Sequence, residues 1–80
     1  MILELHKHHG GRTGDAILAA LRDAGTALRV KDLARAAARH GADAPAVAPT
    51  VSRMLRDGTL ALAPGQAPGT PLPLLHVRPA

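Results

Sequence analysis

The sequence predicts an α+β fold that is mostly α, with three helices and a small sheet of two or three strands. Three segments repeat their apolar residues with the 3.6-residue period of a helix, and each is followed by a glycine, at positions 25, 41 and 58. Short segments with alternating apolar residues precede the second helix and follow the third, and such alternation is typical of strands. We expect one domain over residues 13–80, preceded by a flexible segment over residues 1–12.

The first helix is expected over residues 14–24. Thr13 or Asp15 is placed to cap the free N–H groups at its start. One side of this helix is apolar and consists of Ile17, Leu18, Leu21 and Ala24.

The second helix is expected over residues 31–40, after a short strand within residues 26–30. His40 falls in its last turn, where a positive charge suits the helix dipole. Its apolar side consists of Leu33, Ala34 and Ala37.

The third helix is expected over residues 44–57, after a short turn from Gly41 to the capping residue Asp43. Pro49 deletes one backbone hydrogen bond, so an irregular first turn is expected. The apolar side repeats at helical spacing and consists of Val47, Val51, Met54 and Leu55.

Two strands are expected after the third helix, over residues 59–63 and 72–78. Residues 64–71 are rich in proline and glycine and are expected to form a mobile loop. Pro73 has no N–H to donate, which favours an edge position for the start of the last strand.

Composition narrows the classes of function. Ten lysines and arginines against six acidic residues give a net charge of +4, which favours a nucleic-acid partner, although a GC-rich genome also yields basic proteins. Because there is no cysteine, disulfides and thiolate metal sites are excluded. The core must be built without aromatic residues, so modest stability is expected. No leader or membrane-spanning run is recognised, and a cytoplasmic location is expected.

Two segments resemble the winged helix-turn-helix superfamily of bacterial DNA-binding regulators. Residues 28–34, LRVKDLA, resemble the entry into its second helix, and residues 47–60, VAPTVSRMLRDGTL, resemble its recognition helix and the start of its wing. The resemblance implies a non-catalytic DNA-binding protein, a small transcriptional regulator that inserts helix 44–57 into the major groove and forms a homodimer. This chain departs from most members in three ways: it lacks aromatic residues, its wing is rich in proline and has no lysine or arginine between residues 57 and 77, and no long helix for dimerisation follows the wing.

The resemblance also indicates which residues meet the DNA. Ala46, Thr50, Arg53 and Asp57 lie at helical spacing on the side opposite the apolar one, flanked by Ser52 and Arg56. Arg53 is expected to contact a base, because a guanidinium can bridge guanine O6 and N7. Thr50 is expected to reach a base edge or a phosphate. The cations expected on phosphates are Arg56, Arg29, Lys31 and Arg35.

Other chemistry is weakly indicated. His6, His8 and His9 are dense enough to bind Zn²⁺, with His40 or His76 as further ligands, but a basic tail is the simpler interpretation, and neither cofactor nor metal is expected. Ser52 has no His or acid at helical spacing to activate it, so no catalytic site is expected. The alternative function is a winged-helix module that binds another protein. The segment Met1–Leu5 is expected to pair in a dimer or to cover the core.

Overall fold

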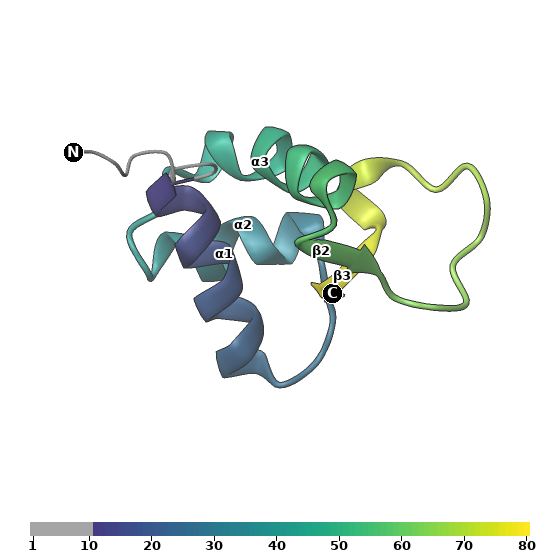
Figure 1. Cartoon of the computed structure of the whole chain (residues 1–80), viewed down its shortest axis with the longest axis horizontal. Helices are drawn as coiled ribbons and strands as arrows, with labels where there is room; N and C mark the ends of the chain where they lie inside the picture. The colour runs from purple at the N-terminus through teal and green to yellow at the C-terminus, as the bar shows by residue number, and fades with distance from the viewer. Residues whose placement is uncertain (1–10) are drawn as a thin grey trace.

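The computed structural model describes residues 11–80, which form three helices and a three-stranded antiparallel sheet (Figure 1). The predicted α+β class is confirmed. The expectations for residues 1–5 and for His6, His8 and His9 lie outside the described residues. The elements, in chain order, are α1 (Gly11–Ala24), β1 (Leu28–Arg29), α2 (Val30–Ala38), α3 (Ala44–Asp57), β2 (Leu60–Leu62), the short 3-10 helix η2 (Leu72–Leu74) and β3 (His76–Pro79).

Helix α1 begins earlier than predicted. It starts at Gly11, so Thr13 and Asp15 lie within the helix and do not cap it, and residues 11 and 12 belong to the helix. Gly14 is buried and α1 packs against α3, so tertiary contact holds the first turns in place. At the other end Ala24 is exposed, contrary to the prediction, because the last turn of α1 extends past the other helices (Figure 1).

Helices α2 and α3 are joined by a tight turn. Helix α2 ends at Ala38, so His40 lies in the turn and not in the last helical turn as predicted. Helix α3 has the predicted bounds and runs without a break through Pro49, contrary to the expected irregular start. Pro49 has no N–H, so the carbonyl of Pro45 loses its helical hydrogen-bond partner. Because Pro45 and Pro49 are both exposed, this carbonyl lies on the exposed side of the helix, where water can replace the bond.

Gly58 ends α3 in the left-handed conformation, with φ +86°. A Cβ there would meet nothing within 4 Å, so the expected cost of Gly58→Ala is backbone strain alone, about 1–2 kcal/mol of unfolding free energy. Urea denaturation monitored by circular dichroism measures this loss. An unchanged midpoint would contradict it.

The sheet has the strand order β1-β3-β2. Its central strand β3 starts at His76, so the predicted strand 72–78 is wrong in its first part, where residues Leu72–Leu74 form η2. Pro73 explains the difference, because a central strand needs N–H donors that proline lacks. Pro79 is tolerated because it lies at the strand end opposite Leu60, past the two residues that pair with β1.

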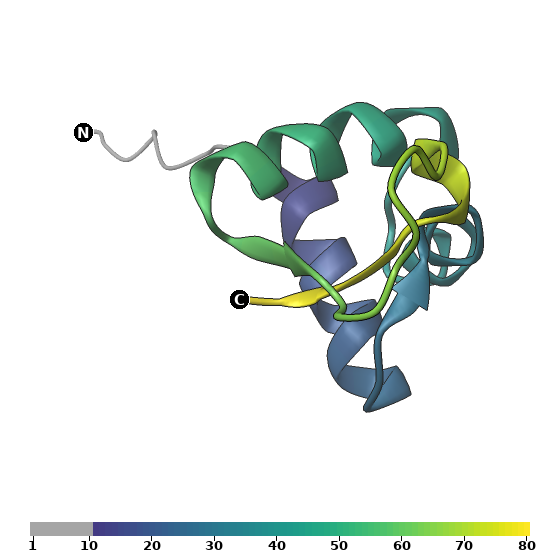
Figure 2. The ribbon, with the colours of Figure 1, turned by 90° about the vertical axis from the view of Figure 1, so that its right-hand side faces the viewer.

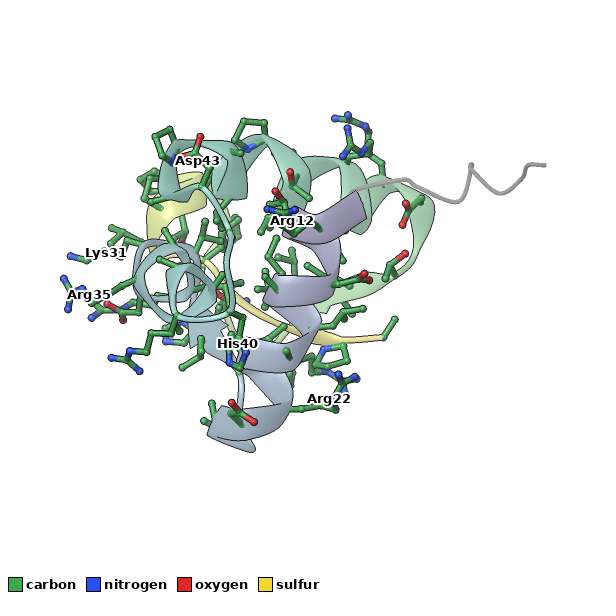
Figure 3. The ribbon with its side chains drawn as sticks, turned by 90° about the vertical axis from the view of Figure 1, so that its left-hand side faces the viewer. Arg12, Arg22, Lys31, Arg35, His40 and Asp43 are labelled. Atoms are coloured by element: carbon green, nitrogen blue, oxygen red, sulfur yellow. The ribbon has the colours of Figure 1, made fainter. Side chains whose placement is uncertain are left out.

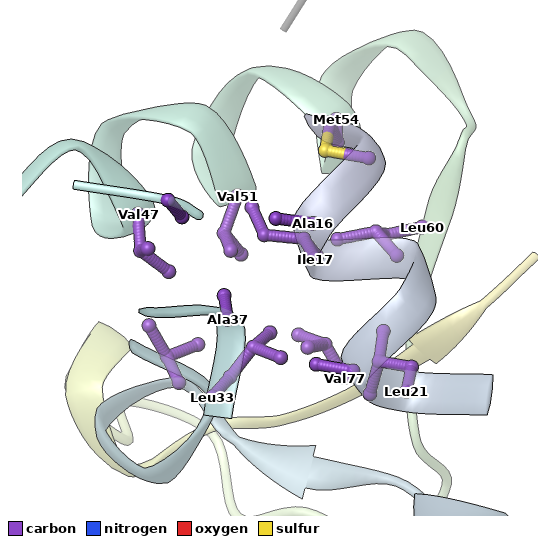
Figure 4. Packing of buried hydrophobic residues seen from close by; sticks show 13 residues of the cluster. Ala16, Ile17, Leu21, Leu33, Ala37, Val47, Val51, Met54, Leu60 and Val77 are labelled. Atoms are coloured by element: carbon purple, nitrogen blue, oxygen red, sulfur yellow. The ribbon is translucent and has the colours of Figure 1, made fainter. Parts of the chain in front are cut away.

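One apolar cluster connects the three helices with the sheet (Figure 4). It contains no aromatic side chain, as the composition requires. Its buried members are Ala16, Ile17, Ala20, Leu21, Val30, Leu33, Ala37, Ala42, Val47, Val51, Met54, Leu60 and Val77. The apolar sides predicted for the three helices therefore face this cluster, although Leu18, Ala34 and Leu55 are only partly buried. Within residues 11–80, no helix is long and apolar enough to cross a membrane.

Candidate nucleic-acid interface

Helix α3 lies along one border of the described structure, and no other described element covers its outer side (Figures 1 and 2). Its buried side consists of Val47, Thr50, Val51 and Met54. The residues opposite them are exposed, and they include Pro45, Pro49, Arg53 and Arg56. We call these four residues the outer face of α3.

This outer face is rotated from the predicted one. Thr50, predicted to contact DNA, is buried with 6% of its surface exposed, and its hydroxyl donates to the Ala46 carbonyl at 2.7 Å. It lies three residues after Val47 and four before Met54, which places it within the apolar side. A small hydroxyl that bonds to its own helix is tolerated in a core. The predicted exposure of Thr50 is therefore wrong, whereas Ala46 is half-buried and its predicted contact stays a prediction.

The second half of the outer face carries the two arginines. Arg53 and Arg56 are exposed, and no ion pair involves either within residues 11–80. Ser52, half-buried, flanks them. Asp57 is exposed and is directed toward β2: its Oδ1 accepts hydrogen bonds from the Thr59 backbone N–H at 2.9 Å and from the Thr59 hydroxyl at 2.6 Å. Both guanidinium groups are thus accessible to an anionic partner.

Helix α2 presents a second group of cations. Lys31 and Arg35 are exposed at i, i+4 and point away from the helix on the same side (Figure 3). Arg39 continues this series four residues later and is exposed in the following turn. Arg29, also predicted to bind phosphate, is instead half-buried and pairs with Asp32 at 2.9 Å between Nε and Oδ2. The ion pair competes with any phosphate for this guanidinium.

The connection between β2 and β3 carries no charge. There is no acidic or basic residue between Asp57 and His76. Gln66 closes its base: the side-chain nitrogen donates to the carbonyls of Ala63 and His76, both at 2.8 Å, and the side-chain oxygen accepts from the His76 N–H. This glutamine was not recognised in the sequence, because two of its three hydrogen bonds join it to His76, ten residues away in the opposite arm of the connection.

The remaining titratable groups give little additional chemistry. His40 Nε2 lies 2.9 Å from Asp23 Oδ2, which links the turn after α2 to the end of α1. His76 is exposed on β3. Within residues 11–80 no group of three or more histidine, aspartate or glutamate side chains is arranged to hold a metal ion.

The prolines of the outer face were not recognised as candidate site residues in the sequence. Their spacing could have indicated this face, because Pro45 and Pro49 precede Arg53 at intervals of four residues and so lie on the same side of a helix. It was obscured by the assignment of Thr50 to the exposed side, which shifted the expected face by about one quarter of a turn.

Comparison of the chain with protein-family models, with curated proteins and with solved structures found no match.

Proposed function

We propose that this chain is a winged helix-turn-helix domain that binds double-stranded DNA non-catalytically, with α3 in the major groove. The order of the elements supports the proposal, because α1 is followed by β1, the α2–turn–α3 pair and a β2–β3 hairpin. In this interpretation the β2–β3 connection is the wing. The major groove is about 12 Å wide and admits a helix whose outer side is uncovered.

The observation that carries the proposal is the accessibility of Arg53 and Arg56 on the outer face of α3. An exposed guanidinium that has no carboxylate partner within residues 11–80 can bond to guanine or phosphate without first breaking an ion pair to that part of the chain. Arg53 is the proposed base contact, and Arg56 and Ser52 flank it.

Lys31 and Arg35 are the proposed phosphate contacts on α2. Phosphate contacts fix the position of a protein on the duplex without reading its sequence. Arg29 contributes less in this proposal, since its guanidinium is already paired with Asp32. The uncharged wing supplies no cation.

A small transcriptional regulator that acts as a homodimer in the cytoplasm is the biological role proposed here. Two-fold dimers of such domains bind half-sites about 34 Å apart, one turn of the duplex. Binding to a palindromic operator would follow from that symmetry.

The test is binding of the full chain to a mixed-sequence duplex at several salt concentrations, measured by fluorescence anisotropy. Three phosphate contacts, from Lys31, Arg35 and Arg56, predict a slope of about −3 in a plot of log K against log salt. Absence of binding at low salt, or a slope near zero, would contradict the proposal.

A second candidate function is a module that binds another protein through the wing. It is favoured by two exposed leucines next to the uncharged connection, Leu62 and Leu74, which are 48% and 42% exposed. Exposed apolar side chains mark protein contacts where they gather. This candidate replaces the first if the duplex does not bind.

A further inference from the structure

The outer face of α3 has two chemically different halves. Its first half exposes the rings of Pro45 and Pro49, and its second half exposes the guanidinium groups of Arg53 and Arg56. At 1.5 Å per residue, the two prolines are about 6 Å apart along the helix, and Arg53 follows at the same interval. A single face in one groove would therefore present an apolar pair and then a basic pair.

Pro49 destabilises α3 at its position. A proline inside a helix costs about 3 kcal/mol relative to alanine, because it removes a hydrogen bond and crowds the preceding turn. Its ring is exposed, so packing within the described chain offsets little of that cost. A costly residue on an uncovered surface indicates a role in contact with a partner.

The chemistry of a proline ring limits what it can recognise. It has neither a side-chain donor nor an acceptor, so the first half of the outer face cannot form side-chain hydrogen bonds with base edges. In the major groove, the feature that an apolar group can distinguish is the C5-methyl group of thymine.

We propose that Pro45 and Pro49 contact thymine methyl groups and select thymines beside the base that Arg53 contacts. This inference rests on the proposed function, since it requires α3 to lie in the major groove. It assigns sequence preference to two prolines, whereas Lys31 and Arg35 contribute affinity alone.

The experiment begins with selection of tight-binding sequences from a pool of random duplexes by the full chain. Each thymine of the selected site is then replaced by deoxyuridine, which removes the methyl group and retains base pairing. We expect about four-fold weaker binding for each contacted methyl, the loss that corresponds to one buried CH₂ group.

Proline variants assign the effect to α3. Pro49→Ala removes most of the ring without disturbing the helix, so at the thymine that Pro49 contacts this variant should bind the thymine and deoxyuridine duplexes within two-fold of each other. The thymine that Pro45 contacts should keep its ratio in this variant, and an unchanged ratio at every thymine would overturn the inference. Pro68→Ala, at an exposed position of the β2–β3 connection, is the matched control and should keep the full ratio. Loss of the ratio in both variants would overturn the inference.

The two levels of the proposal fail in different ways. Tight, salt-dependent binding with no preference for thymine over deoxyuridine overturns the proline contacts and leaves DNA binding by α3 in place. Failure to bind any duplex overturns the proposed function itself.

Discussion

Leu33→Ala is expected to lower the free energy of unfolding by about 3 kcal/mol, the cost of removing a buried leucine and leaving a cavity. Leu33 is fully buried in the apolar cluster shared by the three helices and the sheet (Figure 4). An 80-residue chain has about 4–12 kcal/mol of stability in total, so the variant should lose a large fraction of it. Urea denaturation followed by circular dichroism measures the change.

Leu74→Ala is the matched control for that substitution. Leu74 lies on η2 and is 42% exposed, so its truncation should change the unfolding free energy by less than about 1 kcal/mol. Equal losses from the two variants would show that the apolar cluster does not dominate the stability of the fold.

Arg53→Ala is expected to cost about 1–3 kcal/mol of DNA binding and to relax base preference at one position of the site. Arg35→Ala should instead weaken binding to all sequences and make the salt slope shallower by about one unit. The difference follows from the proposed roles, because one guanidinium contacts a base edge and the other a phosphate. Salt titrations with the selected duplex and its single-base variants distinguish the two results.

Arg22→Ala controls for net charge. Arg22 is exposed in the last turn of α1, well away from Lys31 and Arg35 (Figure 3). Arg22→Ala removes one positive charge, as Arg53→Ala and Arg35→Ala do, but it should leave both the affinity for DNA and the salt slope nearly unchanged. Equal small losses from all three variants would mean that the basic surface is incidental, and binding of a protein through the wing would become the leading proposal.

The helices and most of the core could be predicted from the sequence, because both depend on local spacing. Val47, Val51 and Met54 recur at helical intervals, so any compact arrangement buries them together. The end of α3 could also be predicted from a local feature, since Gly58 readily adopts the left-handed conformation that terminates a helix.

The candidate site was predicted less well. Arg53, Arg56, Lys31 and Arg35 are exposed as expected, but Thr50 is in the core and Arg29 is in an ion pair. A threonine at helical spacing from both apolar and polar neighbours fits either side of the helix. The packing of α1 beside α3 decides which side is buried, and that contact joins residues far apart in the chain.

The sequence by itself therefore determined the three helices, the apolar positions of the core and the basic character of the chain, because period, capping and charge act over a few residues. The tertiary structure decided the start of α1, the rotation of the outer face of α3 and the replacement of half a strand by η2. It also brought Gln66 to His76 across the β2–β3 connection. Each of these depends on which distant segments meet, and that is set by packing rather than by local preference.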